Sequence, residues 1–289
     1  MKATTGNPFT PFSLNLRRRL IIFDRPAVMG IVNVTPDSFY SQSRVADAGL
    51  IRQRAVQMAS DGADIIDVGG CSTRPGAGEV SVDEETSRVV EAVRAIRAIL
   101  PDIPLSVDTY RASVAREAVA AGADIVNDIS GGDLDPDMIP AVADMSVPYI
   151  LMHMRGTPAN MQQLTDYGHK SVTEAVITSL AGKVSRCVDA GITDIIVDPG
   201  FGFAKTVEQN YELMRHLPLL KEALQLPVLV GISRKSMITR PLGISADDAL
   251  APTAALNTIA LTLGASIVRV HDVQAAARTV ALTQLLYKS

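Results

Sequence analysis

Residues 62–76, with the sequence GADIIDVGGCSTRPG, contain one complete unit of the pattern that decides the fold. A glycine suited to ending a helix precedes a short apolar run over 63–68, which is typical of a buried strand. The loop that follows carries Thr73, Arg74 and Pro75. Related phrases begin at Gly122 (GADIVNDISGG), Gly191 (GITDIIVDPGFG) and Gly264 (GASIVRVHDV). One helix–strand unit is therefore reused along the chain.

The same alternation extends outward from this unit over most of the chain. Strand-like apolar runs occupy residues 27–32, 63–68, 104–107, 123–126, 147–152, 194–197, 227–230 and 265–270. Segments with helical features occupy residues 45–60, 81–100, 111–121, 136–145, 170–190, 206–224, 245–263 and 273–286. Capping boxes are expected where two of these helices begin, at Ser81 with Glu84 and at Thr206 with Gln209.

Strict alternation of strands and helices predicts parallel strands joined by right-handed crossovers. Eight such units predict an α/β protein, a (β/α)8 TIM barrel. A doubly wound open sheet is the alternative, but the G-x-G-x-x-G turn that would follow its first strand is missing. We expect one barrel domain over residues 27–289, preceded by a short N-terminal extension over residues 1–26.

The composition excludes several classes of protein. The chain has 289 residues, is 47% hydrophobic and carries a formal net charge of −4, so nothing in it favours nucleic acid as a partner. Its two cysteines, Cys71 and Cys187, indicate neither a zinc site nor a disulfide framework. No signal peptide or membrane-spanning run is evident, so we expect a cytoplasmic protein with no membrane partner. Arg17, Arg18 and Arg19 are interpreted as part of a solvated lead-in containing a short hairpin.

Polar residues follow the predicted strands, whereas the repeated glycines precede them. In TIM barrels the carboxyl ends of the strands form the active site and the opposite ends serve stability. The glycines are thus assigned to the stable end. The polar residues expected to converge on one mouth are Asn33, Thr73, Arg74, Asp108, Asn127, His153, Asp198, Lys235, Arg269 and His271.

These groups suggest two kinds of ligand chemistry. Asp108, Asn127 and Asp198 offer acceptors and a donor to a flat heterocycle with ring N–H and amino groups. The cationic residues would suit an anionic group such as a diphosphate. Asn33 adds an oxygen ligand for a Mg²⁺ ion that accompanies such a group. The segments 35–44 and 71–78 are interpreted as mobile covers over the site.

Seven phrases at the predicted strand ends resemble those of the dihydropteroate synthase family. They are residues 33–39 (NVTPDSF), 69–76 (GGCSTRPG), 106–109 (SVDT), 127–128 (ND), 198–203 (DPGFGF), 231–236 (GISRKS) and 269–271 (RVH). The resemblance covers essentially the whole chain from residue 27 onward. It implies a TIM barrel that joins para-aminobenzoate to 6-hydroxymethyl-7,8-dihydropterin diphosphate and releases diphosphate, with sulfonamides as competitors.

The resemblance also implies a role for individual residues. Catalysis would involve Asp37, Arg74, Asp108 and Lys235. The pterin would be held by Asp108, Asn127, Met152, Asp198, Phe203 and Lys235. The diphosphate would be held by Asn33, Arg74, Arg269 and His271, with Mg²⁺ on Asn33. The para-aminobenzoate site would be formed by Phe39, Thr73, Pro75, Arg234 and Ser236. The family reacts dissociatively and forms homodimers, for which the last two predicted helices could supply the interface.

Two other functions compete with this interpretation, and the intact cationic residues Arg74, Arg269 and His271 argue against both. One is a pterin-binding methyltransferase domain of the corrinoid pathway, which has no diphosphate to expel. The other is a pterin-binding protein without synthase activity. The sequence departs from the family's pattern in residues 40–44 (YSQSR), at Cys71 and at Ala204, which stands where a glycine is common.

Overall fold

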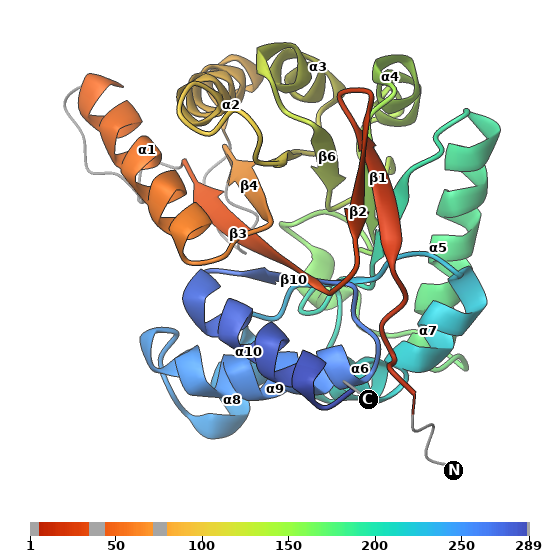
Figure 1. Cartoon of the computed structure of the whole chain (residues 1–289). Helices are drawn as coiled ribbons and strands as arrows, with labels where there is room; N and C mark the ends of the chain where they lie inside the picture. The colour runs from red at the N-terminus through yellow and green to blue at the C-terminus, as the bar shows by residue number, and fades with distance from the viewer. Residues whose placement is uncertain (1–5, 35–43, 72–79, 288–289) are drawn as a thin grey trace.

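Eight parallel strands form the centre of the computed structural model, which describes residues 6–34, 44–71 and 80–287 (Figure 1). The strands are β3 (Ala27–Asn33), β4 (Ile65–Gly69), β5 (Leu105–Asp108), β6 (Ile125–Asp128), β7 (Tyr149–Met152), β8 (Ile195–Asp198), β9 (Leu229–Val230) and β10 (Ile267–Val270). Their order is β8-β7-β6-β5-β4-β3-β10-β9. A parallel bridge between Val197 and Val228 joins the two ends. The predicted barrel is confirmed, and this closure rules out the open-sheet alternative.

Helices surround the strands and separate them along the chain (Figure 1). They are α1 (Arg44–Ser60), α2 (Val82–Arg97), α3 (Ala112–Ala121), α4 (Met138–Met145), α5 (Val172–Asp189), α6 (Val207–Arg215), α7 (Leu217–Leu224), α8 (Ser236–Leu242), α9 (Leu250–Thr262) and α10 (Val273–Leu285). Among the described residues, short 3₁₀ helices occupy Met161–Gln163 and Asp247–Ala249. The apolar faces of the helices pack on the outer faces of the strands in one large core.

Two predicted helices differ from the observed ones. The segment predicted as one helix over 206–224 is divided into α6 and α7 at His216. Pro218 explains the break, because it has no N–H to donate to the preceding turn. The segment predicted over 245–263 begins instead as a 3₁₀ turn, and α9 starts at Leu250. The short helix α8 lies outside the eight predicted helical segments.

The predicted helix ends agree in part with the structure. Thr206 and Gln209 form a complete capping box, with a Gln209 N–Thr206 Oγ1 distance of 3.2 Å. Ser81 accepts the N–H of Glu84 at 3.2 Å, but the Glu84 carboxylate pairs with Arg88 instead of returning to the cap. Gly122 ends α3 with φ 120°, a left-handed conformation that favours glycine. The repeated glycine is therefore a helix stop at the stable end of the barrel.

The N-terminal residues form a hairpin across one end of the barrel (Figure 1). Strands β1 (Phe12–Leu16) and β2 (Arg19–Phe23) pair antiparallel. Leu14, Leu16 and Phe23 are buried against the inward-facing side chains at the N-terminal ends of the barrel strands. The predicted hairpin is confirmed, but the segment is more than a solvated lead-in because it covers the apolar bottom of the barrel.

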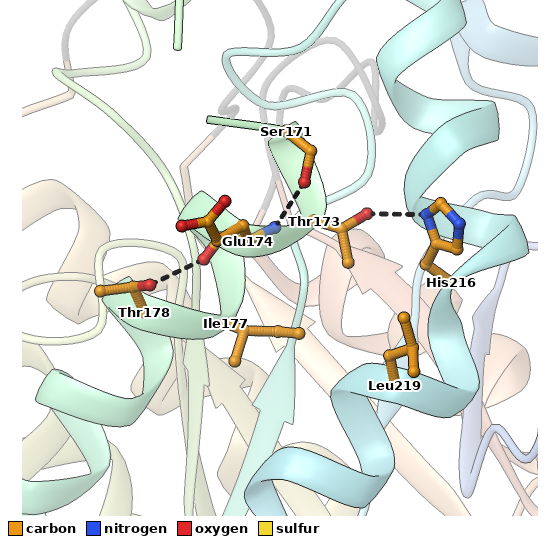
Figure 2. A pocket seen from close by; sticks show the side chains of 7 residues that line it. All are labelled: Ser171, Thr173, Glu174, Ile177, Thr178, His216 and Leu219. Atoms are coloured by element: carbon orange, nitrogen blue, oxygen red, sulfur yellow. Dashed lines mark hydrogen bonds between the residues drawn. The ribbon is translucent and has the colours of Figure 1, made fainter. Parts of the chain in front are cut away.

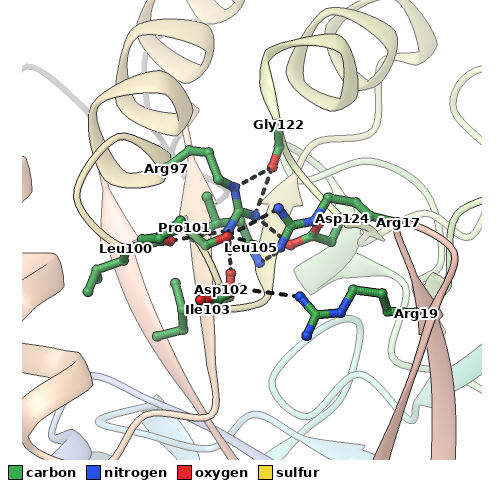
Figure 3. A network of polar contacts seen from close by, with 10 residues as sticks. All are labelled: Arg17, Arg19, Arg97, Leu100, Pro101, Asp102, Ile103, Leu105, Gly122 and Asp124. Atoms are coloured by element: carbon green, nitrogen blue, oxygen red, sulfur yellow. Dashed lines mark hydrogen bonds and ion pairs between the residues drawn. The ribbon is translucent and has the colours of Figure 1, made fainter.

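A cluster of buried charged groups joins the elements at this end of the barrel (Figure 3). The Arg97 guanidinium donates to the carbonyls of Leu100, Pro101, Ile103 and Gly122 and lies 2.6 Å from Asp124 Oδ2. Asp124 is fully buried and also accepts the N–H of Leu105 at 2.8 Å. Arg17 of the hairpin pairs with its other oxygen at 2.6 Å. One arginine thus connects helix α2 with the starts of β5 and β6.

Cys71 and Cys187 form no disulfide within the residues that the structure describes. No helix in the described part of the chain has the length and apolar character needed to cross a membrane.

Candidate active site

The carboxyl ends of β4, β5 and β6 bring several predicted site residues to one level. Gly69, Asp108 and Asn127 are neighbours in register across these three strands. A Cβ added at Gly69 would lie 3.7 Å from Asn33 Oδ1 and 3.9 Å from Asp108 Oδ2. The glycine therefore leaves space between an amide oxygen and a carboxylate. Asn33, Asp108 and Asn127 converge as the sequence predicted.

Arg269 reaches from β10 to two aspartates. Its Nε and Nη2 lie 2.7 and 2.6 Å from Asp67 Oδ2, and Nη2 lies 2.5 Å from Asp108 Oδ2. Asn127 Nδ2 donates to the same Asp67 oxygen at 3.1 Å. Sequence reasoning missed Asp67, although a charged residue inside a fully apolar strand, IIDVG, was a signal that could have found it.

The Asp108 carboxyl group is close to half ionised at neutral pH. Burial raises its pKa to about 7 against the opposing effect of Arg269, and the charges of Asp67, Asp128 and Glu85 act in the same direction as burial. Burial acts to lower the pKa of Arg269, but the carboxylates of Asp67 and Asp108 outweigh it and raise that pKa above its usual value. The arginine stays charged while the Asp108 proton can be exchanged.

Asp198 and Lys235 form a second polar group across the mouth. Asp198 Oδ1 accepts the N–H of Gly200 at 2.7 Å, and burial raises its pKa despite the nearby Lys235. Lys235 Nζ donates to the carbonyl of Phe201 at 2.7 Å and lies 4.8 Å from the centre of the Phe203 ring. Burial lowers the pKa of Lys235 to about 8. This carboxylate and ammonium can hold a polar heterocycle edge beside an aromatic wall.

Apolar side chains form that wall. Met152 and Phe203 are buried in one small cluster with Ile129, Met154, Met161 and Ala204. Met152 is in register with Asp198, so the apolar and polar parts of the wall are neighbours. The structure brings Met152 and Phe203 together as expected.

The loop after β8 is supported from beneath by Lys205. Its Nζ donates to the carbonyls of Gly200 and Phe203 at 2.9 and 3.0 Å and lies 3.0 Å from His153 Nδ1. Burial, with the Lys205 charge, lowers the pKa of His153 to about 2, so the imidazole is neutral and accepts. His153 was expected at the mouth and is instead buried beneath the loop. Ala204 has φ 50°, the left-handed region, which explains why glycine is common at this position.

The remaining predicted site residues follow β9 and β10, and not all of them are available to a substrate. The Arg234 guanidinium pairs with both oxygens of Asp272 at 2.9 and 2.7 Å. The structure therefore does not bring it together with the polar residues at the strand ends. Ser236 is exposed at the start of α8. His271 Nδ1 lies 3.0 Å from Ser233 Oγ, which orients the ring after β10.

Five predicted site residues lie outside the described residues: Asp37, Phe39, Thr73, Arg74 and Pro75.

A separate cavity of about 290 Å³ lies in the helical layer (Figure 2). It is lined by Ser171, Thr173, Glu174, Ile177, Thr178, His216 and Leu219, and none of the predicted site residues is among them. Thr173 Oγ1 lies 3.2 Å from His216 Nδ1 in its wall. The candidate active site is therefore the group of polar residues at the strand ends, not this cavity.

Comparison with known proteins agrees with this geometry. A family model described as "Pterin binding enzyme" matches residues 29–271, from within β3 to the residue after β10. Because this match covers most of the chain, the chain belongs to that family of pterin-binding barrels.

Several relatives of this chain are dihydropteroate synthases. One from Synechocystis is 45% identical over 265 residues, which is 91% of each chain. Another from Clostridium beijerinckii is 42% identical and covers 92% of this chain and 96% of its own. The Xanthomonas albilineans enzyme with 4-aminobenzoic acid superposes with a TM-score of 0.87 at 38% identity, covering 97% of this chain and 100% of its own. A Yersinia pestis complex with a sulfonamide drug gives a TM-score of 0.86 at 39% identity, covering 95% and 98%.

Proposed function

We infer that the chain is a transferase of folate biosynthesis, a dihydropteroate synthase in activity. It condenses 6-hydroxymethyl-7,8-dihydropterin diphosphate with para-aminobenzoate and forms the C–N bond of 7,8-dihydropteroate. The observation that carries this function is the joint placement of Asp108, Asn127 and Arg269 at the strand ends of a barrel. Full-length relatives with that activity support it.

We assign pterin binding to the groups on β5, β6 and β8. Asp108 and Asp198 present buried carboxyl oxygens to the N–H and amino groups of the ring, and Asn127 presents both an acceptor and donors. Lys235 donates to a ring acceptor, while Met152 and Phe203 pack on the flat faces. The mixture of a polar edge and apolar faces matches the chemistry of a pterin.

The diphosphate is assigned to Arg74, Arg269 and His271, with Asn33 providing an oxygen for Mg²⁺. The residues present fit this ion: Asn33 is half-buried and its Oδ1 faces the space beside Gly69. The described residues contain no cluster of three or more acidic, histidine or cysteine ligands. That agrees with an ion held mainly by phosphate oxygens and water. When bound, Mg²⁺ neutralises charge that develops on the leaving diphosphate.

The reaction we propose is dissociative. The bond between the pterin methylene carbon and the diphosphate oxygen breaks first, and its electron pair leaves with the diphosphate. Asp108 stabilises the positive charge left on the ring system, and Asp37, Arg74 and Lys235 complete the catalytic set. The arylamine nitrogen then attacks the methylene carbon and loses a proton to solvent or to the departing anion. No side chain forms a covalent bond to the pterin.

We assign the second substrate to Phe39, Thr73, Pro75, Arg234 and Ser236. One solved relative is a complex with 4-aminobenzoate and another is a complex with a sulfonamide drug, which supports binding of both kinds of compound. Because Arg234 is paired with Asp272, its contribution comes from shaping the loop after β9 rather than from a free guanidinium. Sulfonamides are accordingly expected to compete with para-aminobenzoate.

Formation of 7,8-dihydropteroate tests the function directly. Mass spectrometry of a reaction containing both substrates and Mg²⁺ should detect the conjugate, and omission of para-aminobenzoate should abolish it. The methyltransferase alternative predicts no conjugate, but methyl transfer from a methylated pterin to a corrinoid. A pterin-binding protein without activity would bind the pterin and form neither product.

The pH dependence of kcat/KM for the pterin diphosphate should be bell-shaped, with its maximum between the pKa values of Asp108 and Lys235. Activity is lost as pH falls through about 7, because the Asp108 carboxylate takes up a proton. It is also lost as pH rises through about 8, because Lys235 loses its charge. Initial rates from pH 5.5 to 9.5 would measure both limbs. A flat profile over this interval would contradict these assignments.

We also propose that the protein forms a cytoplasmic homodimer through α9 and α10, which lie next to each other (Figure 1). Ile259 on α9 is 45% exposed, and Leu282 and Leu285 on α10 are 66% and 60% exposed. Apolar side chains in such number on adjoining helices suit a second copy of the chain. Sedimentation equilibrium should give twice the chain mass, and a monomer at micromolar concentration would exclude this interface.

A further inference from the structure

Asp67 is a buried charge that the proposed chemistry does not use. It lies in the middle of β4 and is fully buried. Ile31 on one side and Ser106 on the other are its register neighbours, one layer below Gly69, Asp108 and Asn127. The layer beneath consists of apolar side chains that fill the barrel. A carboxylate between these two layers is costly unless it is fully engaged with positive or donor groups.

Its partners belong to the candidate active site. One oxygen, Oδ2, receives Nε and Nη2 of Arg269 at 2.7 and 2.6 Å and Nδ2 of Asn127 at 3.1 Å. The strand order places β10 two positions from β4 on one side and β6 two positions away on the other. A single oxygen thus connects two site residues across the interior of the barrel.

Other buried aspartates of this barrel contact side chains but hold backbone N–H groups as well. Asp124 accepts the N–H of Leu105, and Asp128 accepts the N–H groups of Ser130 and Gly132. Asp67 makes no hydrogen bond to a backbone group among the described residues, and its Oδ1 has no hydrogen-bond partner there. Its contacts are therefore those of a residue that orients other side chains rather than a loop or turn.

Arg269 is shared between two carboxylates, and only one of them is assigned to the substrate. Its Nη2 bridges Asp67 and Asp108. A pterin that takes hydrogen bonds from Asp108 competes with this contact. When the pterin displaces Arg269 from Asp108, the guanidinium still has Asp67 as a charged partner for its Nε and Nη2. Without that charge, Asp108 would be the only carboxylate partner of Arg269 in these contacts, and the arginine would compete more strongly with the pterin.

We propose that Asp67 is a positioning residue of the pterin diphosphate site, which holds Arg269 and Asn127 in a fixed relation and keeps Arg269 from blocking Asp108. This inference rests on the proposed function for the roles of Arg269, Asn127 and Asp108. Asp67 is fully buried one layer below Asp108, so we assign it a role through these residues rather than through contact with a substrate.

The Asp67→Asn variant removes the charge while keeping the shape. We expect the KM for the pterin diphosphate to rise roughly 10- to 100-fold, as for the loss of a hydrogen bond between charged groups. The KM for para-aminobenzoate should change less than about twofold. Asp124→Asn is the matched control, because it alters a buried aspartate at the far end of the barrel; it should lower Tm and leave both KM values unchanged. Equal KM values in Asp67→Asn and the unmodified enzyme would overturn the proposal.

Two further variants separate positioning from general stability. Asp67→Glu keeps the charge and should raise the KM less than Asp67→Asn does; a larger increase would overturn the proposal. Adding Asp67→Asn to Arg269→Lys should raise the KM less than about threefold further, because the two changes remove one shared interaction. Independent, multiplicative effects would contradict it.

The same variants distinguish this inference from the proposed function. Isothermal titration with the dihydropterin diphosphate, without para-aminobenzoate, measures Kd whether or not the enzyme turns over. An unmodified protein that binds this ligand without forming product would refute the function, while a weaker Kd in Asp67→Asn would still support positioning. Normal turnover together with an unchanged Kd in Asp67→Asn would refute the positioning role alone.

Discussion

Asp108→Asn is expected to lower kcat about 100- to 1,000-fold, the cost typical of removing one group that stabilises transition-state charge. Asparagine keeps the shape and one acceptor oxygen, so the Kd of the pterin should change less than about tenfold. The large effect falls on kcat because positive charge develops on the ring only after the C–O bond begins to break. Single-turnover rates, with Kd from calorimetry, measure the two quantities separately.

Asp144→Asn provides the control for this prediction. Asp144 lies on the exposed surface and pairs with Arg116 at 2.7 Å. It is not one of the residues assigned to either substrate. It should leave kcat and Kd unchanged within about twofold. If Asp108→Asn weakened pterin binding as much as it slowed turnover, Asp108 would be a binding residue only, and its role in stabilising the cation would be wrong.

Arg97→Met is expected to lower the free energy of unfolding by about 3–5 kcal/mol, the range for removing one partner of a buried ion pair. The change leaves Asp124 buried with the half-exposed Arg17 as its remaining cation (Figure 3). It also removes the Arg97 hydrogen bonds to the carbonyls of Leu100, Ile103 and Gly122, whereas the carbonyl of Pro101 keeps Arg17 as a donor. The activity per folded molecule should be unchanged, because the cluster lies at the end of the barrel opposite the site. Urea denaturation followed by circular dichroism measures the difference.

Arg19→Met is the matched control for Arg97→Met. Arg19 belongs to the same region and pairs with Asp102 at 3.3 Å, but its side chain is 71% exposed. Loss of such a pair should cost less than about 1 kcal/mol. Similar effects of the two substitutions would mean that the Arg97 cluster does not fasten the hairpin end of the barrel.

The repeated glycine, strand and polar residue predicted most of the fold because all three are local signals. Helix stops such as Gly122 and alternating apolar segments depend on a few neighbouring residues, so they can be read from sequence. Two of the departures from the predicted fold have different causes. Pro218 divides a helix whose apolar spacing is otherwise continuous, and the hairpin became structural through Leu14 and Leu16, whose burial depends on the distant barrel bottom.

The candidate site was predictable only as a set of residue types at strand ends. That Asp108 and Arg269 meet follows from strand order and from barrel closure, and the sequence indicated their convergence but not their pairing. Asp67 was missed because it lies inside a strand rather than after one. Arg234 was assigned to a ligand although Asp272, further along the chain, takes up its guanidinium. Such long-range pairings leave no local pattern.

The central claim is that this barrel exchanges the diphosphate of a dihydropterin for an arylamine. It is tested most directly by diphosphate release from 6-hydroxymethyl-7,8-dihydropterin diphosphate, measured with and without para-aminobenzoate. With both substrates and Mg²⁺, we predict sustained release of one diphosphate per dihydropteroate formed, inhibition by a sulfonamide that para-aminobenzoate relieves, and no release after Mg²⁺ is chelated. Absence of diphosphate release and of conjugate in the presence of both substrates and Mg²⁺ would contradict the account.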